Sequence, residues 1–409
     1  MWPYKLQCFE CQRGFPAEEA GFRCKTCGGL LEVKFDLAGK REPAWNRRQL
    51  SVWKYRELLP IEKEESIISL AEGGTGLHHC KRLGRKLGLK NLYIKNEGEN
   101  PTGSFKDRGM TVAISKAIEL GKKKVLCAST GNTAASLAAY SARAGMECIV
   151  LMPKGKVAGG KMLQVMMHGA KLIQIRGDFD LALEVAMELA DKRREFYLMN
   201  SINPFRLEGQ KTLAFEILDQ LGNRVPEVVV LPVGNGGNIS AAWKGFSEFQ
   251  QLKIVKNRPR MIGIQAEKAA PIARAVKSGQ SKIRPIHNPQ TIATAIRIGS
   301  PVNWPKVLLA IRESKGTAET VTDRQILEAQ RELATLEGIF VEPASAASIA
   351  GLKRLSDEGR MDPSEIIVCV TTGHGLKDPS VLERLPKSQT GYNLEITNGS
   401  RLEALERIL

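Results

Sequence analysis

The feature that most constrains the fold of this chain is a regular alternation of short apolar stretches with longer segments of helical pattern. Apolar runs occur at residues 125–128, 148–152 and 171–175, and each is followed within a few residues by a segment whose apolar side chains have helical spacing. Strands and helices that alternate at this pitch form right-handed βαβ units, whose strands lie parallel in one sheet. The sequence therefore predicts an α/β fold built on parallel sheet.

The same alternation continues in the second half of the chain. Two fully apolar strands are expected at 228–233 and 366–370, with helical patterns before and between them. A long polar segment, 280–304, interrupts this pattern, and a loop of that length favours a functional role. With 409 residues, the chain has room for about two or three domains.

The composition sets limits on partners and location. Lys and Arg number 60 against 44 Asp and Glu, which gives a net charge of +16, but aromatic residues are only 6% and the basic residues are scattered. This pattern favours a solvated surface over a nucleic-acid interface, and its sign suits a small anionic substrate. No apolar run approaches the length of a membrane span, and residues 1–10 lack a signal-peptide core. We therefore expect a cytoplasmic protein without a membrane span.

Four of the eight cysteines form a CxxC-x12-CxxC pattern near the start of the chain: Cys8, Cys11, Cys24 and Cys27. Two such pairs bring four thiolates within reach of one tetrahedral zinc ion, as in a zinc ribbon. A pair of disulfides is the less favoured alternative in a chain without a secretion signal. A segment this short buries little apolar surface, so the metal would supply much of its folding free energy.

The loop at residues 100–109 (NPTGSFKDRG) places a lysine where chemistry rather than stability explains it. Ser104 is expected to cap a helix that starts at residue 105 or 106 and stops at Gly121. Lys106 then lies in the first turn, where the helix dipole disfavours a cation and lowers the amine pKa. A neutral amine can form an imine with an aldehyde, whereas a solvated surface lysine is the alternative.

Three further polar segments stand at the ends of predicted strands. Three of the residues 234–238 (GNGGN) are glycines, so backbone N–H groups beside a helix N-terminus could contact a phosphate directly. The alternative is a tight turn without a ligand. Residues 129–133 (STGNT) suit a carboxylate, or cap a helix. Thr371 and Thr372 put hydroxyls at the end of a buried strand, or are simply β-branched strand residues. Together with an imine-forming lysine, these groups are what pyridoxal phosphate requires.

Seven stretches of the chain resemble the threonine synthases, a family of fold-type-II pyridoxal phosphate enzymes. They lie between residues about 50 and 380, in the family's order, and are NPTGSFKDRG, STGNTAAS, NSINPFRLEGQKT, VGNGGN, RIGSPVNW, EPASAAS and TTGHGLKD. The resemblance implies two doubly wound βαβ domains behind a small zinc ribbon. The implied segments are 1–36 (ribbon), 37–98 (linker and first part of a large domain), 99–204 (small domain with the lysine), 205–385 (rest of the large domain) and 386–409 (a tail of open role).

The resemblance also implies a role for each site residue. Lys106 would hold the cofactor as a Schiff base and then carry protons as general base and acid. The other cofactor contacts would be Asn132 at the ring hydroxyl, Gly234, Asn235, Gly236, Gly237 and Asn238 around the phosphate, and Thr372 at the pyridine nitrogen. The substrate contacts would be Thr130 and Thr133 at the carboxylate, and Asn200, Ser201 and Arg206 at the substrate's own phosphate.

The reaction implied by the resemblance is the conversion of O-phospho-L-homoserine and water to L-threonine and phosphate, by γ-elimination and β-addition of water, in a homodimer. Cysteate synthase is the nearest alternative, because phosphoserine also needs a phosphate site. A threonine or serine dehydratase is less favoured, because it has no use for a second phosphate site. A zinc-ribbon protein that binds nucleic acid is the non-enzymatic alternative, and it leaves Lys106 and the Gly-rich loop unexplained.

Overall fold

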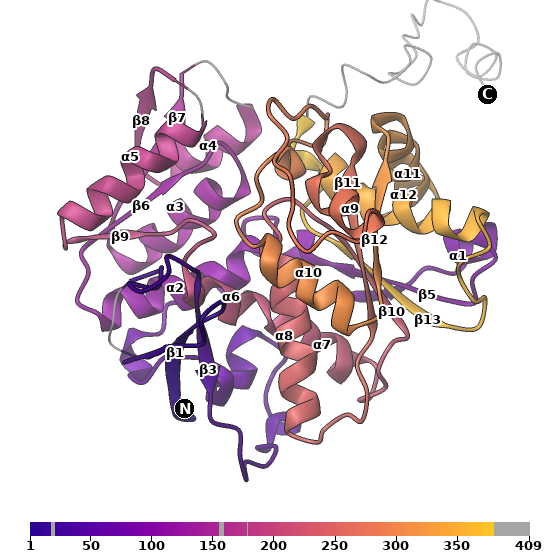
Figure 1. Cartoon of the computed structure of the whole chain (residues 1–409), viewed down its shortest axis with the longest axis horizontal. Helices are drawn as coiled ribbons and strands as arrows, with labels where there is room; N and C mark the ends of the chain where they lie inside the picture. Colours follow the sequence, from indigo (N-terminus) through magenta and orange to yellow (C-terminus); the bar gives the residue numbers. More distant parts are fainter. Residues whose placement is uncertain (18–20, 155–158, 178, 380–409) are drawn as a thin grey trace, which may run out of the picture.

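The computed structural model describes residues 1–17, 21–154, 159–177 and 179–379, which form three sheets (Figure 1). A six-stranded sheet has the order β12-β11-β10-β13-β5-β4, a four-stranded sheet the order β8-β7-β6-β9, and a small sheet the order β2-β1-β3. All pairs in the two larger sheets are parallel except β4 with β5. The predicted α/β class with parallel sheets is confirmed.

The six-stranded sheet is built from segments at both ends of the main fold. Its strands are β4 (Leu77–His79), β5 (Asn91–Asn96), β10 (Val228–Pro232), β11 (Arg260–Ala266), β12 (Thr317–Val321) and β13 (Ile366–Thr371). Alternate residues of β10 enter two different hydrophobic clusters, one on each face of the sheet. The first face is covered by α1 (Lys81–Leu87), α11 (Asp323–Glu337) and α12 (Pro343–Asp357). The second is covered by α7 (Thr212–Gln220), α8 (Gly237–Gln251), α9 (Pro271–Lys277) and α10 (Trp304–Glu313).

The four-stranded sheet lies beside the larger one, as the magenta lobe of Figure 1. Its strands are β6 (Lys124–Ala128), β7 (Glu147–Pro153), β8 (Lys171–Ile175) and β9 (Phe196–Leu198). Helices α2 (Lys106–Glu119), α3 (Asn132–Ala144) and α4 (Gly159–Met167) pack on one side, and α5 (Phe179–Lys192) packs on the other. These strands fall inside the expected small domain, while its limits at 99 and 204 stay a prediction.

The N-terminal segment is a three-stranded antiparallel sheet that packs against the main body. It contains β1 (Tyr4–Cys8), β2 (Gly14–Phe15) and β3 (Leu31–Phe35), and β3 confirms the strand that the alternating residues 31–36 predict. Leu6, Leu31 and Val33 are buried in the same hydrophobic cluster as Met110 of α2 and Phe205 of α6 (Pro204–Gln210). The ribbon therefore shares its core with the helices around the predicted lysine rather than folding apart from them.

The local pattern also predicts helices over residues 78–87 and 206–221, and the structure differs at both. His78 and His79 form β4 against β5, so the first helix starts only at Lys81. The helix expected at 206–221 is divided in two at Lys211, between α6 and α7. In both places a tertiary partner, an open sheet edge or a neighbouring helix, outweighs the local pattern.

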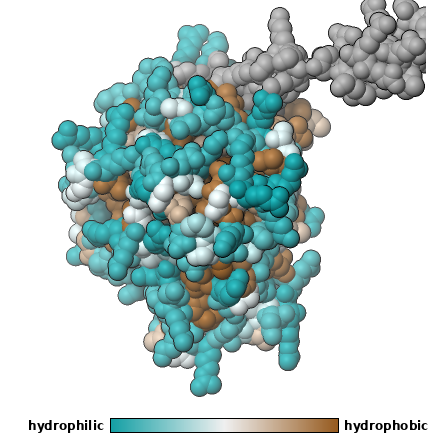
Figure 2. All heavy atoms as spheres, turned by 90° about the vertical axis from the view of Figure 1, so that its right-hand side faces the viewer, coloured by the Kyte–Doolittle hydropathy of each residue, from teal (hydrophilic) through white to brown (hydrophobic). Residues whose placement is uncertain are grey.

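Figure 2 shows the face on the right-hand side of Figure 1, where hydrophilic side chains cover most of the area and hydrophobic side chains form smaller areas between them. Within the described ranges, no helix is both long enough and apolar enough to cross a membrane.

Candidate active site

Three parts of the predicted site, Lys106, the Gly-rich loop and Thr372, stand at the carboxyl ends of strands in the six-stranded sheet. Strands β5, β10 and β13 are parallel neighbours, so the segments that follow them meet at their carboxyl ends. The loop before Lys106 pairs with the end of β13, because the Phe105 N–H donates to the Thr372 carbonyl at 3.0 Å and Ser104 bridges to Gly373. The lysine and the strand-end threonine are therefore brought together.

Lys106 is the first residue of α2 and its side chain is half-buried, with Nζ 4.1 Å from the centroid of the Phe105 ring. Burial and, second, the nearby positive charge of Arg206 lower the Lys106 pKa to about 7, and Glu342 acts in the opposite direction. About half of the molecules would then carry a neutral amine at pH 7. The prediction of a lowered lysine pKa is supported, although burial rather than the helix dipole is its largest cause.

The start of α2 is held by a residue that the sequence did not single out. Ser104 was expected to be the cap, but the N-cap position is Phe105, and the Ser104 hydroxyl lacks a hydrogen bond to any described residue. Instead the buried Asp107 carboxylate accepts hydrogen bonds from the Thr102 N–H (2.7 Å), the Thr102 hydroxyl (2.6 Å) and the Ser136 hydroxyl (2.5 Å). These bonds fix the loop immediately before the lysine.

The Gly-rich loop between β10 and α8 leaves its helix N-terminus open. Gly236 is the N-cap, with φ of +81°, and a Cβ there would lie 2.4 Å from a Val307 methyl. Within the described chain no side chain caps α8, so its first N–H groups have no intrahelical acceptor. The Asn238 side-chain amide is buried and its Nδ2 also lacks a partner there. An anion with several oxygens, such as a phosphate, fits this end of the helix.

Asn132 begins α3 and is 4% exposed. Its Nδ2 donates to Glu342 Oε1 at 2.9 Å, while its Oδ1 has no hydrogen-bond partner among the described residues. Glu342 stands just before α12 and was not predicted as a site residue, although it opens the EPASAAS stretch. A Cβ on Gly373 would lie 2.7 Å from Glu342 Oε1, so glycine is needed there to leave the space open.

Thr372 follows β13 and is 5% exposed. Its hydroxyl lies 2.9 Å from the Ser345 hydroxyl, and the Ser345 hydroxyl also accepts from the Thr372 N–H at 2.9 Å. Ser345 therefore orients the threonine. A hydroxyl held in this way can still serve one more partner, as a pyridine nitrogen would require.

Arg206 on α6 is 2% exposed, and no described carboxylate pairs with it. Its Nη1 donates to the Met199 carbonyl at 2.9 Å, while its Nε has no partner in the described part of the chain. Burial lowers its pKa to about 10, which still leaves it charged at neutral pH. A buried charge without an opposite charge is costly, so the site favours an anionic ligand.

The remaining predicted substrate residues lie around this arginine and at the start of α3. Asn200 uses its side-chain amide to bond both the N–H (3.0 Å) and the carbonyl (2.9 Å) of Ala128. The Ser201 carbonyl accepts from Asn303, whose own N–H donates to the Asn235 carbonyl, which links this segment to the Gly-rich loop. Thr130 and Thr133 are half-buried beside Asn132.

The open polar groups match the parts of pyridoxal phosphate. A neutral amine, an unsatisfied amide oxygen and an uncapped helix N-terminus correspond to its aldehyde, its ring hydroxyl and its phosphate. Arg206 is not used by this set, and its buried charge suits a further anion.

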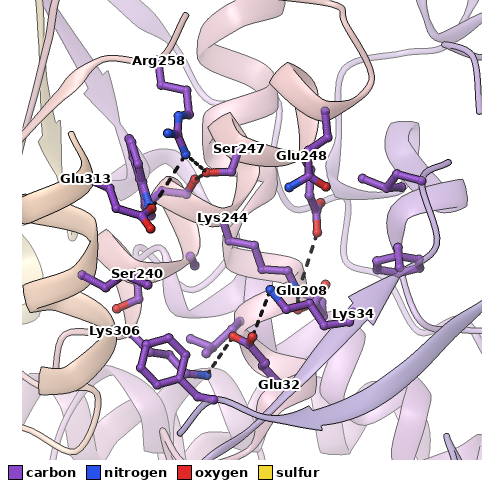
Figure 3. Close-up of a pocket in the computed structure, with 18 residues that line it drawn as sticks. Glu32, Lys34, Glu208, Ser240, Lys244, Ser247, Glu248, Arg258, Lys306 and Glu313 are labelled. Carbon is purple, nitrogen blue, oxygen red and sulfur yellow. Dashed lines mark hydrogen bonds and ion pairs between the residues drawn. The ribbon is translucent and has the colours of Figure 1, made fainter. Parts of the chain in front are cut away.

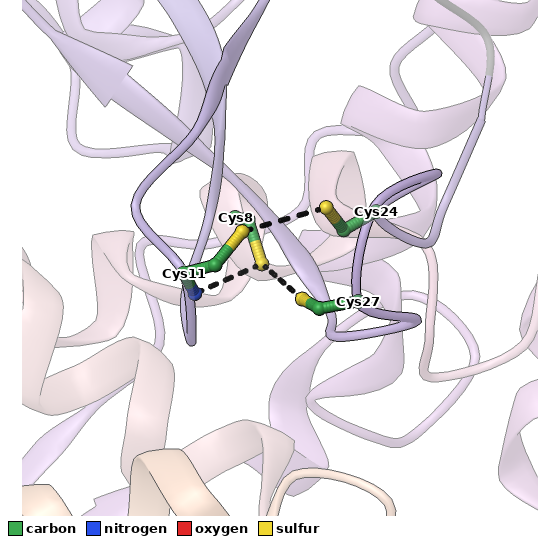
Figure 4. Close-up of side chains that lie close together, drawn as sticks. All are labelled: Cys8, Cys11, Cys24 and Cys27. Atoms are coloured by element: carbon green, nitrogen blue, oxygen red, sulfur yellow. Dashed lines mark hydrogen bonds between the residues drawn. The ribbon is translucent and has the colours of Figure 1, made fainter.

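The four N-terminal cysteines form a separate cluster, shown in Figure 4. Their sulfur atoms all lie within 4.8 Å of one another, with 3.5 Å between Cys8 and Cys27 and 3.6 Å between Cys11 and Cys24. These distances exclude disulfides and approach the S–S separation of about 3.8 Å around a tetrahedral zinc ion. Backbone N–H groups point at two of the sulfurs, from Cys11 to Cys8 and from Thr26 to Cys24, as metal knuckles require.

Comparison with known proteins agrees with this geometry. Residues 68–373 match the family model described as pyridoxal-phosphate dependent enzyme. A protein of Methanocaldococcus jannaschii named threonine synthase is 57% identical over 92% of this chain and 94% of its own. A protein of Mycobacterium tuberculosis with the same name is 50% identical over 81% of this chain and 90% of its own.

Solved structures show the same fold. Maize serine racemase superposes with a TM-score of 0.67 at 22% identity, covering 82% of this chain and 97% of that one. Threonine deaminase isoform 2 of Solanum lycopersicum gives a TM-score of 0.65 at 25% identity, covering 76% of this chain and 86% of that one. The predicted fold class and family are thus confirmed: the chain belongs to the pyridoxal-phosphate-dependent enzymes, and within them to the threonine synthase family.

Proposed function

We propose that this protein converts O-phospho-L-homoserine and water to L-threonine and inorganic phosphate. The observation that carries the proposal is the buried Arg206, which has no described carboxylate partner and is close enough to Lys106 for its charge to lower the lysine pKa. A cofactor phosphate at the start of α8 does not account for this arginine. A substrate with its own phosphate does, since a guanidinium can bind two oxygens of that group.

Pyridoxal phosphate, when bound, supplies an aldehyde for the amine and a conjugated ring that takes up electron density. Lys106 is the residue that would hold it, with Asn132 at the ring hydroxyl and Thr372 at the ring nitrogen. The loop of Gly234, Asn235, Gly236, Gly237 and Asn238 would surround its phosphate. Because Thr372 is a neutral partner, it leaves the ring nitrogen less protonated than a carboxylate would.

The chain's own residues would orient the substrate and move its protons. Thr130 and Thr133, with the N-terminus of α3, bind the carboxylate, and Asn200, Ser201 and Arg206 bind the phosphate. The Lys106 amine, with a pKa of about 7, can accept a proton from the carbon beside the amino group and return it at neutral pH. Arg206 stabilises the charge that develops on the phosphate as it leaves.

The test is an assay of the purified protein loaded with pyridoxal phosphate. O-phospho-L-homoserine should give L-threonine and inorganic phosphate in equal amounts. Parallel reactions receive phosphoserine with sulfite, to detect cysteate formation, and L-threonine or L-serine alone, to detect ammonia release. The proposal fails if phosphohomoserine releases no phosphate, or if the phosphoserine reaction is the faster one.

We also infer a structural zinc ion held by Cys8, Cys11, Cys24 and Cys27. The sulfur separations and the N–H groups that point at two of the sulfurs support this assignment. Atomic emission of the purified protein should give one zinc per chain, and Cys24→Ser should lower that amount while leaving the visible absorbance of bound cofactor intact. Substoichiometric metal in the unaltered protein would contradict the zinc site.

A cytoplasmic homodimer that binds no nucleic acid completes the proposal. Light scattering at several concentrations tests the dimer, and a monomeric mass would contradict it. Titration with a fluorescent DNA duplex at low salt tests the nucleic-acid alternative, which predicts an affinity that falls steeply as salt increases.

A further inference from the structure

A charged cavity of about 360 Å³ lies between the ribbon and the helices α6, α8 and α10. Figure 3 shows basic and acidic side chains that converge on it from these elements: Glu32 and Lys34 from β3, Glu208 from α6, Lys244 and Glu248 from α8, and Lys306 from α10. The reaction proposed above uses none of these residues. Their contacts nevertheless join the ribbon to the helix that carries Arg206.

Glu208 is the centre of these contacts. It lies on α6 and is 1% exposed. Its carboxylate pairs with Lys211 at 2.6 Å and with Lys244, which reaches it from α8. Lys211 is fully buried and also pairs with Glu248 at 2.7 Å. A buried carboxylate that serves two ammonium groups fixes the outer side of α6.

The ribbon reaches the same lysines through β3. The Val33 carbonyl accepts a hydrogen bond from Lys244, so one ammonium group binds both the ribbon backbone and Glu208. The Phe35 ring lies 4.4 Å from Lys211 Nζ, within the range of a cation–π contact. Leu31 and Val33, on the same face of β3 as Phe35, lie in the core shared with α2 and α6. The ribbon thus holds α6 by charge and by packing.

Helical geometry connects this clamp to the active site. Residues 206 and 208 are two positions apart on α6, and two steps of about 100° each place their side chains on nearly opposite sides of the helix. Glu208 therefore faces the ribbon while Arg206 faces Lys106, whose pKa its charge lowers. A rotation of α6 that follows loss of the Lys244 contact would move the guanidinium away from its ligand.

We propose that Lys244 and Glu208 are positioning residues through which the folded ribbon holds Arg206 in place for a phosphate group. The inference rests on the proposed role of Arg206 as the ligand of the substrate phosphate. It assigns the ribbon a part in substrate affinity, beyond the stability of the chain.

The first test measures binding of inorganic phosphate to the cofactor-loaded protein by isothermal titration calorimetry, so that no turnover is needed. Lys244→Met keeps the apolar stem and should raise the phosphate Kd by roughly tenfold, because the charge-assisted contact to Glu208 is lost. Lys34→Met is the matched control, since it removes the same charge from the same cavity and its described ion pair is with Glu32 alone. Equal Kd values for the two variants would overturn the proposal.

The second test asks whether the effect comes from the ribbon. Cys27→Ser removes one thiolate of the cluster and should also raise the phosphate Kd. If Lys244 transmits that effect, the two substitutions act through one contact. The phosphate Kd of the double variant Lys244→Met with Cys27→Ser should then not exceed the higher Kd of the two single variants. The coupling would be contradicted if the increase in Kd of the double variant were the product of the two single increases. It would also be contradicted if the Cys27→Ser protein bound phosphate normally.

Glu208→Gln and Lys244→Arg distinguish loss of the charged contact from a general folding defect. The amide keeps the shape of Glu208 without its charge and should match Lys244→Met, whereas arginine at 244 should restore phosphate binding. The visible absorbance of bound cofactor should be unchanged in every variant. If the unaltered protein neither binds phosphate nor releases it from phosphohomoserine, the proposed function fails; if it does both and Lys244→Met binds phosphate normally, only this inference fails.

Discussion

At the scale of single residues, the positive charge of Arg206 disfavours the charged form of the Lys106 amine. Burial is the larger cause of the Lys106 pKa of about 7, and Arg206 is the next. The neutral fraction of the amine, and hence the rate at which apoprotein takes up pyridoxal phosphate, should rise about tenfold from pH 6 to pH 8. Stopped-flow absorbance measures this rate. A rate that does not change over this range would contradict the lowered pKa.

Replacement of Arg206 by Met separates its two effects. Loss of its positive charge should move the midpoint of the uptake profile to higher pH. Loss of the phosphate contact should lower kcat/KM for O-phospho-L-homoserine by about 100-fold, mostly through KM. Arg206→Lys should restore the midpoint of the uptake profile, because the positive charge is kept. It should restore only part of the substrate affinity, because an ammonium group cannot bind two phosphate oxygens as a guanidinium does. An unchanged KM for O-phospho-L-homoserine in Arg206→Met would contradict a role of Arg206 in substrate binding.

The sequence could indicate Lys106, Asn132 and Thr372 because each stands where a predicted strand ends and a polar loop begins. Glu342 and Asp107 could not be found in the same way. Glu342 matters because it lies beside Asn132, and that contact spans 210 positions of the chain. The role of Asp107 depends on a loop that folds back on the helix start, whereas the local pattern favoured Ser104 as the cap.

At the scale of elements, α2 and α6 cross unusually closely, and glycines on both helices make the crossing possible. A Cβ on Gly209 would lie 1.7 Å from the Arg108 carbonyl oxygen, and one on Gly109 would lie 2.7 Å from the Arg206 carbonyl oxygen. Gly209→Ala should force the helices apart and lower the free energy of unfolding by about 3 kcal/mol. Urea denaturation measures this change.

Gly14→Ala is the control for this substitution. A Cβ at Gly14 would meet its nearest neighbour at 3.7 Å, an ordinary contact, so its cost should stay within about 0.5 kcal/mol. The crossing carries Lys106 on one helix and Arg206 on the other, so Gly209→Ala should also weaken phosphate binding. Wild-type stability in Gly209→Ala would contradict the close approach.

Element boundaries were predictable where a hydrophobic period is strong and short. The apolar strands at 228–233 and 366–370 are β10 and β13, and the alternating residues at 31–36 are β3. Strand β12 was missed because its sequence, TAETV, carries little apolar signal, and among the described strands it pairs with β11 alone, at the sheet edge. Edge strands take their structure from a partner that is distant in sequence.

At the scale of the whole molecule, one buried ion network ties α2 to the large sheet. Arg108 pairs with Glu216 of α7 at 2.6 Å and also with Glu97, and Lys95 of β5 pairs with Glu216 at 2.8 Å. Burial alone would raise the Glu216 pKa, but Arg108 and Lys95 lower it to about 2. The carboxylate thus stabilises the folded state above its ordinary pKa.

This network predicts the acid limit of stability. Because the folded-state pKa of Glu216 is below its unfolded value, its contribution of roughly 3 kcal/mol is complete above about pH 4.5 and is lost as the pH falls toward 2. Glu216→Gln should lower the urea midpoint at pH 7 and flatten the dependence of that midpoint on pH in this range. Glu188 lies on an exposed helix face, so Glu188→Gln should change neither the urea midpoint at pH 7 nor its dependence on pH. If the urea midpoint of Glu216→Gln depended on pH as strongly as that of the unaltered protein, groups other than Glu216 would cause the acid unfolding.

The pairing of β5 with β13 has a consequence for the order of folding during synthesis. Asn91–Asn96 must wait for Ile366–Thr371 before its parallel partner exists, whereas the four-stranded sheet is complete once Leu198 has been made. A ribosome adds residues at about 5 to 20 per second, so β5 stays without that neighbour for roughly 14 to 55 s. Thr372 emerges with the same strand. The nascent chain therefore contains Lys106 long before β13 and Thr372 exist, and we expect a product interrupted before β13 to lack the proposed contact to the ring nitrogen.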